Sequence, residues 1–287
     1  MHWRSMRLGL IGLDGGTTPR GYKMTGSQLH PSTHRRFSQA SFLDDIQLNF
    51  GPIEQLKQFF EAAQRASQSL SVHIRFATFE EVMVINANNQ ASWRAMIPTF
   101  NPQLSELDAD TSFCLVYENS ENGIVGIQCC RLFDWRKTTM YDELTSLRFY
   151  YARPEADSMP DEKCVVSVER TNRISGPTYF SGGVWYHPEH RGKRLGYILP
   201  RVCRAVALTR WNVDLYTTMI QDKVLASDLH LRAGWTNFDW AVENIGSPMG
   251  NIRFAFLWLT REEVIQDLAE FAGGRNRQLN EMLGAVH

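Results

Sequence analysis

The sequence is 287 residues long with a mass of 33.0 kDa, which is enough for one large domain or two smaller ones. Hydrophobic residues make up 43% of the chain and aromatic residues 11%, so a disordered or fibrous protein is excluded. The 30 basic residues nearly balance the 31 acidic ones, and the net charge of −1 at pH 7 argues against a nucleic-acid partner recognised by bulk charge.

The cysteines are five in number and form no C-x-x-C pair, which disfavours both a disulfide framework and a structural zinc site. We therefore expect no bound metal. No stretch approaches the ~18 consecutive apolar residues of a membrane helix, and the apolar segment near the N-terminus is too short for a secretory signal. The sequence predicts a cytoplasmic protein that does not insert into a membrane.

The first 50 residues are predicted to form a basic, poorly structured extension. Residues 1–40 carry six arginine or lysine residues against one aspartate and show no sustained hydrophobic period. Two interpretations stay open: a basic arm that touches a partner or a phosphate of a ligand, and a loosely packed leader. Translation from Met24 is a third interpretation.

Hydrophobic spacing predicts the elements that follow. Ile53, Leu56 and the apolar residues after them recur at helical intervals, so residues 52–68 are expected to form an amphipathic helix. Alternation over residues 72–77 predicts a strand, and residues 80–96 have helical character.

Two β-rich runs come next, at residues 113–117 and 124–133. A polar turn that ends in a glycine joins them, which predicts an antiparallel hairpin. Residues 135–175 are mixed in pattern and are expected to be an insertion. Within it, residues 141–151 have helical character and residues 164–168 predict a further strand.

The second half of the chain alternates between strands and helices. A strand at 179–186 runs into a basic, glycine-containing turn, and an apolar stripe at helical spacing follows from Leu195. Thr260 and Glu263 predict a capping box at the start of a C-terminal helical tail. The remaining predicted elements are a strand at 213–219, a short helix at 223–233, an extended segment at 235–242, a strand at 252–258 and that tail at 261–287.

The junction between the strand at 179–186 and the helix after it has the chemistry of an anion site. The first N–H groups of a helix lack internal partners and the helix dipole is positive there, so a diphosphate fits. Arg191, Lys193 and Arg194 add positive charge. Gly192 and Gly196 let a phosphate approach the backbone closely.

This junction resembles the acyl-CoA pyrophosphate loop of the GNAT acetyltransferase superfamily, usually written R/Q-x-x-G-x-G/A. Arg191 and Gly196 fall on its first and last positions, whereas Arg194 stands where the family has its middle glycine. A second segment, LHLRAGW at residues 229–235, resembles the family's Leu-Tyr-x-x-x-Gly-Phe sequence. The order of the predicted elements also agrees with the family over about residues 70–260.

The resemblance implies a fold class and a division of the chain. We expect an α/β protein with the GNAT-type acyl-CoA N-acyltransferase fold, in which helices flank a mixed, mostly antiparallel central sheet. The acyltransferase domain would span residues 51–260, with the insertion at about 135–175. The basic extension at 1–50 and the helical tail at 261–287 would lie outside the domain.

The resemblance also implies where acetyl-CoA would bind. Amides of the loop would hold the pyrophosphate, while the strand end before the loop would pair with the pantetheine arm and supply an N–H to the oxyanion. Lys223, where the family often has an asparagine that contacts pantetheine, is either a phosphate contact or an exposed residue at a helix start. The other expected cofactor-binding residues are Trp185, Tyr186, Arg191, Gly192, Lys193, Arg194, Leu195, Gly196 and Tyr197.

Two residues are candidates for proton transfer. His230 stands where the family commonly has a tyrosine that protonates the departing CoA thiolate, and an imidazolium can donate that proton. Glu169 is a candidate base for the attacking amine. Each also has a structural interpretation, as a half-buried helix histidine and as a surface carboxylate. Pro200 lies inside the predicted helix, which it should kink or break.

The acceptor side is predicted in outline. Acidic residues of the insertion, such as Glu155 and Glu162, would attract a cationic amine, and aromatic residues such as Phe149 would wall a pocket. A solvated loop and a packed core are the alternatives. A homodimer formed through the strand at 251–259 is also considered, although the apolar face of that strand fits a core equally well.

The sequence therefore predicts an N-acetyltransferase that transfers an acetyl group from acetyl-CoA to a primary amine by direct attack. The cysteines match no covalent acyl-enzyme pattern and are expected to be buried structural thiols. Two alternatives stay open. One is a long-chain N-acyltransferase that uses acyl-CoA or acyl carrier protein, and the other is a non-catalytic GNAT-like module that binds CoA.

Overall fold

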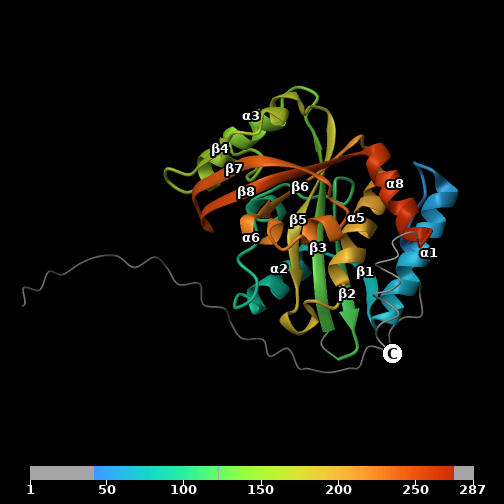
Figure 1. Ribbon diagram of the computed structural model, residues 1–287. Coiled ribbons are helices and arrows are strands. Elements are labelled where there is room, and N and C mark those ends of the chain that lie inside the picture. Colours follow the sequence, from blue (N-terminus) through green and yellow to red (C-terminus); the bar gives the residue numbers. More distant parts are fainter. Residues whose placement is uncertain (1–41, 122, 275–287) are drawn as a thin grey trace, which may run out of the picture. The chain divides into compact units, whose positions relative to one another are not determined.

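One eight-stranded sheet organises the chain, which is described here from a computed structural model (Figure 1). The structure describes residues 42–121 and 123–274. Two units are distinguished along the chain, Met1–Gln39 and Ala40–His287, and the described residues all lie in the second. The strands are β1 (His73–Ala77), β2 (Ser112–Asn119), β3 (Gly123–Asp134), β4 (Lys163–Val166), β5 (Pro177–Tyr186), β6 (Leu215–Gln221), β7 (Asn237–Ser247) and β8 (Gly250–Thr260).

The strands lie in the order β1-β2-β3-β5-β6-β8-β7-β4. Among these described strands β5 and β6 pair in parallel, and every other neighbouring pair is antiparallel. This confirms the predicted fold class, a mixed and mostly antiparallel sheet flanked by helices. The predicted hairpin is β2 and β3, and the predicted insertion contributes β4, which pairs with β7 at one edge of the sheet.

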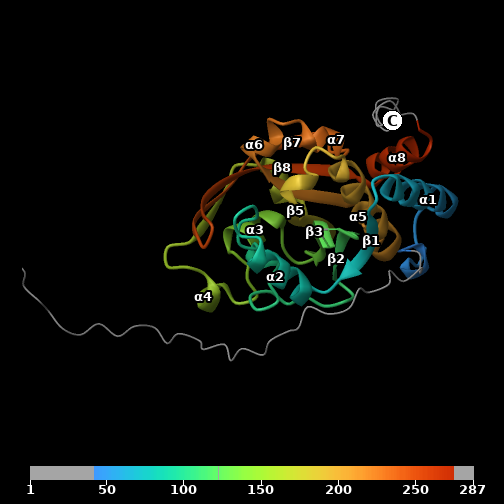
Figure 2. The same cartoon turned by 90° about the horizontal axis from the view of Figure 1, so that it is seen from below.

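Helices cover both faces of the sheet, as Figure 2 shows. One face carries α1, α5 and α8, and the other carries α2 and α3. The α-helices are α1 (Ile53–Ser69), α2 (Phe79–Asn88), α3 (Met140–Thr145), α4 (Pro154–Asp157), α5 (Leu195–Trp211), α6 (Asp222–Leu225), α7 (Leu229–Arg232) and α8 (Arg261–Ala272). The described residues also form the short 3-10 helices η1 (Phe42–Asp45), η2 (Pro98–Phe100), η3 (Glu169–Arg173) and η4 (Pro188–His190).

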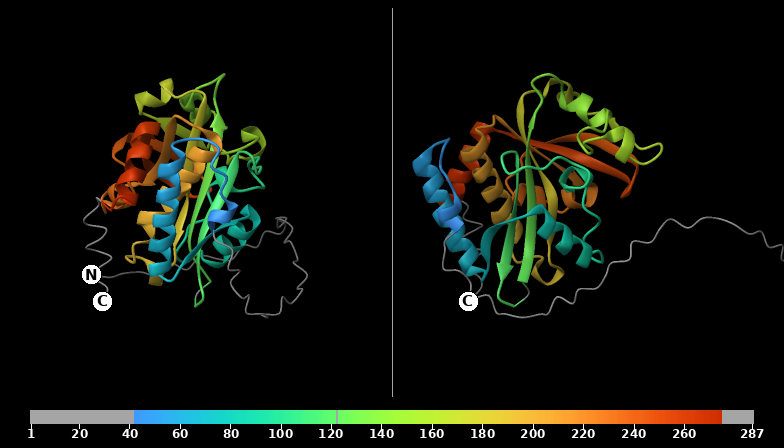
Figure 3. Two further views of the ribbon diagram at one scale, coloured as in Figure 1. Left: turned by 90° about the vertical axis from the view of Figure 1, so that its right-hand side faces the viewer. Right: turned by 180° about the vertical axis from the view of Figure 1, so that it is seen from behind.

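The predicted C-terminal tail begins as a packed part of the core. Phe59 of α1 lies against Phe271 of α8 with ring centroids 5.4 Å apart, and Figure 3 shows the two helices side by side. The capping box at Thr260 and Glu263 is confirmed and fixes the start of α8. Residues 1–41 and 275–287, with the predictions made for them, lie outside the described residues.

Three predicted helices are shorter in the structure. The helical segment expected at 141–151 ends at Thr145. The helix expected at 80–96 ends at Asn88, because amide side chains take the last helical carbonyls: Asn89 donates to Ile85 (2.8 Å) and Gln90 to Asn86 (2.7 Å). The helix expected at 223–233 divides into α6 and α7 at Asp228, whose φ of 56° is left-handed.

β8, the strand whose apolar face is compatible with a dimer contact, is an internal strand of the sheet. β8 lies between β6 and β7, and Phe256 is fully buried in the cluster on the α2 face. Trp258 stacks on Phe256 with centroids 5.8 Å apart. The apolar face of this strand is therefore core. None of the described helices is both long and apolar enough to cross a membrane.

α5 continues through Pro200, so of the kink or break expected there the break does not occur. Pro200 has no N–H, and the carbonyl of Gly196 loses its usual helical donor. Arg201, the next residue, strengthens this turn because its Nη1 donates to the carbonyl of Tyr197 at 2.7 Å. The side chain of Arg201 thus reaches back to the first turn of the helix.

A buried ion pair network joins α5, α7 and α8. Arg201 and Arg204 of α5 both contact the carboxylate of Asp267 on α8, each at 2.8 Å. The same two guanidinium groups donate to the carbonyls of Arg232 and Ala233 at the end of α7, at 2.8 and 2.7 Å. Arg204 is fully buried, and burial lowers the pKa of Arg201. Asp267 is therefore the counter-ion on which the junction of three helices depends.

Replacing Asp267 by alanine should destabilise the protein strongly. Asp267→Ala leaves two buried guanidinium groups without their carboxylate, a change that typically costs about 3–5 kcal/mol. Urea unfolding followed by circular dichroism measures the loss. Glu270→Ala, which removes an exposed carboxylate from the same helix, is the control and should change stability by less than about 0.5 kcal/mol. Equal effects of the two variants would contradict the role given to Asp267.

Candidate functional site

The central feature of the candidate site is the separation of β5 from β6. Their parallel pairing extends from Thr178–Leu215 to Ser181–Thr218 and then stops, although both strands continue. At the last pair the hydroxyl of Thr218 donates to the carbonyl of Ser181 at 2.9 Å. Beyond it, β5 pairs with β3 and β6 pairs with β8. The facing backbone edges of β5 and β6 are left available to a ligand.

A bulge in β5 accompanies this separation. Two residues of β5, Gly183 and Val184, lie opposite Gln128 alone on β3, so the register shifts by one. Gly183 has a φ of 60°, a conformation that favours glycine. A Cβ at the preceding Gly182 would lie 2.9 Å from Cε2 of Phe100. Both glycines are thus required by the local backbone and packing.

The loop after β5 leaves several amides without protein acceptors. The N–H groups of Arg191 and Lys193 donate to Pro188 and His190, and that of Tyr197 donates to the carbonyl of Arg194. Within the described residues, nothing in the protein accepts from four further loop amides. These are the amides of Gly192, Arg194, Leu195 and Gly196. Their position at the positive end of a 17-residue helix is chemically suited to an anion.

Side chains fasten this loop to the segment after α2. Arg191 donates to the carbonyl of Tyr186 at 3.1 Å and to the carbonyl of Ser92 at 3.0 Å. Trp185 donates through Nε1 to the Ser92 hydroxyl at 3.1 Å and stacks on Trp93 at 5.4 Å. Arg191 and Trp185, both expected to bind the cofactor, therefore also hold the loop in place.

The basic residues of the loop differ in their surroundings. Lys193 and Gly192 are exposed, whereas Arg194 is half-buried in a left-handed conformation with a φ of 70°. A glycine, which the resembled motif has at this position, adopts such a φ without strain. The backbone of Arg194 is strained in the same conformation because arginine has a Cβ. The Nη1 of Arg194 is buried and has no acceptor in the described part of the chain.

Tyr186 and α7 meet at the start of α5. A Cβ at Gly196 would lie 3.2 Å from Leu229 and 3.6 Å from the ring of Tyr186, so glycine lets these groups pack closely. Burial raises the pKa of the Tyr186 phenol, which stays protonated. Leu195 is buried beneath the same turn. The packing brings α7, which carries His230, to the candidate anion site.

His230 is buried, with 7% of its surface exposed, and its ring lies edge-on to Phe238 of β7 at 6.0 Å. Its Nδ1 is buried and has no partner among the described residues. Burial lowers the pKa of His230 below its usual 6.5, and Asp228 opposes this effect. The imidazole is therefore neutral at pH 7, and an imidazolium donor forms only after the ring accepts a proton.

Two further predicted residues are exposed, and one of them lies away from this arrangement. Lys223 is exposed on α6 and has no side-chain partner within the described residues. Glu169 is exposed at the start of η3 and lines a small hollow with Leu215, the first residue of β6. The loop and α7 lie toward the other end of β5 and β6. Glu169 is thus not brought together with His230.

The acidic residues of the insertion have structural partners. Asp157 pairs with Arg153 at 3.2 Å, and Glu162 accepts from the hydroxyl of Tyr151 at 2.8 Å.

All five cysteines are free and buried, as expected. Burial raises the pKa of Cys164 to about 12, which disfavours a thiolate nucleophile there.

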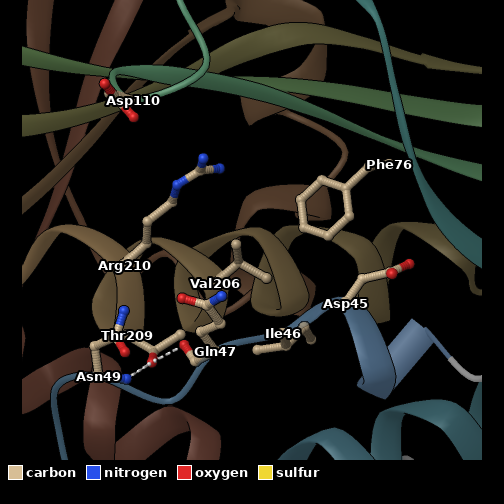
Figure 4. Close-up of a pocket in the computed structure, with 9 residues that line it drawn as sticks. All are labelled: Asp45, Ile46, Gln47, Asn49, Phe76, Asp110, Val206, Thr209 and Arg210. Atoms are coloured by element: carbon tan, nitrogen blue, oxygen red, sulfur yellow. Dashed lines mark hydrogen bonds between the residues drawn. The ribbon is translucent and has the colours of Figure 1, made fainter.

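A separate pocket of about 460 Å³ lies at the far end of α5. Figure 4 shows Arg210, Thr209 and Val206 of this helix on one side and Phe76 on the other. The hydroxyl of Thr209 accepts from the amide of Asn49 at 2.9 Å, and both residues line the pocket. None of the predicted site residues lines it.

Sequence reasoning missed Ser92 and the glycine pair of β5. Ser92 belongs to no motif, and its role appears only when the chain folds back onto the loop. Gly182 and Gly183 did carry a signal, because two glycines inside a strand indicate a bulge or a close approach.

No family profile and no curated protein matches the chain. Solved structures that match include the putative acetyltransferase YncA from Salmonella typhimurium with acetyl-CoA: 19% identity, 66% of this chain, 94% of that chain and a TM-score of 0.36. Another is the spermidine/spermine N-acetyltransferase SpeG from Vibrio cholerae: 12% identity, 68% of this chain, 97% of that chain and a TM-score of 0.43.

A third match is a GNAT-family acetyltransferase from Streptococcus pneumoniae, at 11% identity over 66% of this chain and 98% of that chain, with a TM-score of 0.39. The resemblance to the GNAT superfamily is carried by the two motifs, at residues 191–196 and 229–235. At these identities the likeness concerns the fold alone. What the neighbours bind or acetylate is a property of those proteins.

Removing the side chain of Arg191 should loosen the loop. Arg191→Ala loses two hydrogen bonds to backbone carbonyls on a partly solvated surface, which we expect to cost about 1 kcal/mol. Amide hydrogen exchange at residues 187–196 and urea unfolding measure the effect. Lys193→Ala is the matched control, because this exposed side chain donates to no group in the described residues. Faster exchange in both variants alike would contradict the fastening role of Arg191.

Proposed function

We propose that the protein transfers an acetyl group from acetyl-CoA to a primary amine by direct attack on the thioester. The observation that carries this proposal is the set of four unbonded amides at the start of α5, placed beside the separation of β5 and β6. A diphosphate joined to an extended arm needs these two features next to each other.

The loop would hold the pyrophosphate of acetyl-CoA. The amides of Gly192, Arg194, Leu195 and Gly196 would donate to its oxygens, and Lys193 would add a charge. The cofactor would supply the activated acyl group. The residues present fit this ligand, because the orphaned amides and the buried, unpartnered Nη1 of Arg194 need acceptors.

The edge of β5 would hold the pantetheine arm as an added strand. Trp185 and Tyr186 pair with Ile127 and Gly126 of β3 through one edge, and the other edge faces the opening toward β6. An N–H on this edge near Tyr186 would stabilise the oxyanion of the tetrahedral intermediate. The protein would thereby align the thioester for attack.

His230 would move the proton that the reaction releases. Neither β5 nor β6 contains an aspartate or glutamate, so their sequences offer no carboxylate base beside the opening. The neutral imidazole would accept the proton that the amine loses as it attacks, and would return it to the thiolate when the carbon–sulfur bond breaks. The products are an amide and CoA with a protonated thiol.

Reversing the charge of Lys193 should weaken acetyl-CoA binding. Lys193→Glu places a carboxylate beside the proposed pyrophosphate, and we expect the Kd from isothermal titration calorimetry to rise about tenfold at low salt. Lys137→Glu is the control, because it makes the same change of net charge on an exposed turn after β3. An equal rise in both variants would mean that only overall charge matters.

Replacing His230 should lower turnover and remove an acid limb. The pKa of His230 lies below 6.5. Wild-type kcat should fall as the pH drops through the pKa of His230, because the base becomes protonated. His230→Gln should lower kcat about 100-fold, leave the Kd for acetyl-CoA unchanged and lose this dependence. An unchanged kcat at saturating acetyl-CoA would remove His230 from the mechanism.

A further inference from the structure

The pocket at the C-terminal end of α5, which we call the α5 pocket, lies apart from the candidate cofactor site. Its volume of about 460 Å³ is within the usual range of small-molecule sites, roughly 300–1,000 Å³. Arg210 lines this pocket, whereas the unbonded loop amides lie at the start of the helix, around Leu195. From residue 195 to residue 210 an α-helix rises about 22 Å. A ligand in the α5 pocket would therefore leave the loop free.

Part of the α5 pocket is lined by apolar side chains. Val206 is buried in the core beneath α5, and Ile46 and Phe76 are partly buried against the same core. The ring of Phe76 is held by Phe42 and Phe113, with ring centroids 5.7 and 5.9 Å away. The apolar part of a ligand would lose contact with water against these residues.

Hydrogen bonds hold the polar part of the α5 pocket in place. The hydroxyl of Thr209 donates to the carbonyl of Gln47 at 2.8 Å and accepts from the amide of Asn49 at 2.9 Å (Figure 4). Trp211 donates through Nε1 to the carbonyl of Asp110 at 2.6 Å. Two segments that are distant in sequence are thus tied to the end of α5, so the pocket is formed before a ligand binds.

Arg210 supplies a positive charge that is only partly engaged. Its Nη2 donates to the carbonyl of Ala109, and its guanidinium carbon lies 5.9 Å from the ring centroid of Phe113. No group in the described residues accepts from its Nε or Nη1. Figure 4 shows the side chain extending between Asp110 and Phe76. A guanidinium held in this way can bind a carboxylate through charge-assisted hydrogen bonds.

Negative charge lines the same pocket. Asp45 and Asp110 are both lining residues, and neither forms an ion pair with any group in the described part of the chain. Asp110 directly follows Ala109, whose carbonyl holds Arg210, so these two opposite charges belong to one side of the pocket. The C-terminal end of α5 adds the negative end of the helix dipole, which favours a cation. A ligand that carries both a carboxylate and an ammonium group matches this arrangement.

We propose that the α5 pocket binds an α-amino acid with an apolar side chain. Its carboxylate accepts from Arg210, its ammonium group donates to Asp110, and its side chain lies against Phe76 and Val206. The proposal is independent of acetyl transfer, because no lining residue of the α5 pocket belongs to the candidate cofactor site.

A panel of ligands tests the proposal on the full-length protein, without acetyl-CoA. Binding of L-phenylalanine is measured by ligand-observed NMR titration beside two analogues, 3-phenylpropionate, which lacks the ammonium group, and phenethylamine, which lacks the carboxylate. We expect phenylalanine to bind with a Kd in the millimolar range or below, and each analogue to bind about tenfold more weakly or worse.

Three results of this panel would overturn the proposal. Absence of phenylalanine binding at about 20 mM would mean that the pocket is not a site for this class of ligand. Equal binding of either analogue would remove the recognition of one charged group. Tighter binding of L-lysine than of L-phenylalanine would contradict the apolar side chain and point to Asp45 as a further partner.

Substitutions in the α5 pocket locate the binding. Arg210→Gln and Asp110→Asn should each weaken phenylalanine binding about tenfold. Arg65→Gln and Asp214→Asn make the same chemical changes at residues whose side chains are 68% and 90% exposed and which do not line the pocket, and should leave the Kd unchanged. Thermal unfolding checks that each variant folds. An unchanged Kd in folded Arg210→Gln or Asp110→Asn contradicts the assignment, and the ligand panel on wild type decides the proposal even if one variant does not fold.

Discussion

The candidate site depends on one constraint in the sheet, the end of pairing between β5 and β6 after Ser181 and Thr218. A sheet normally gains by continuing such a pair, since unpaired strand edges attract other chains. The bulge at Gly183, which shifts the register of β5 against β3, lies two residues after the last pair. The facing strand edges carry backbone donors and acceptors, which is the recognition chemistry of an extended ligand arm.

The hydrogen bonds that hold the loop after β5 and the end of α7 come from distant parts of the sequence. Arg191 and Trp185 reach the segment at Ser92, while Arg201 and Arg204 hold the end of α7 through its carbonyls. Placement of reacting groups to within a fraction of an ångström requires such second contacts. They come from loops and helices outside the two motifs, so the motifs alone do not determine the geometry of the site.

The sequence predicted the fold class and the order of the elements along the chain, because hydrophobic periodicity reports on local structure and two spaced motifs resemble those of one superfamily. The order of the strands within the sheet came only from the structure. It could not predict that Asn89 and Gln90 end α2 early, since that depends on competition between amide side chains and backbone donors. Glu169 was a candidate base from its type and approximate position in the chain. Its distance from α7 follows from which end of β6 it adjoins, a property of topology that composition and spacing do not contain.

The counter-ion of the two buried arginines arrives late in the chain. Asp267 follows Arg204 by 63 residues, and β6, β7 and β8 must all be made before it. During synthesis on the ribosome, the face of the sheet under α5 therefore cannot close with its charges balanced until α8 has emerged. A chain that stops before α8 would have both guanidinium groups without Asp267, so this layer of the fold depends on the last described helix.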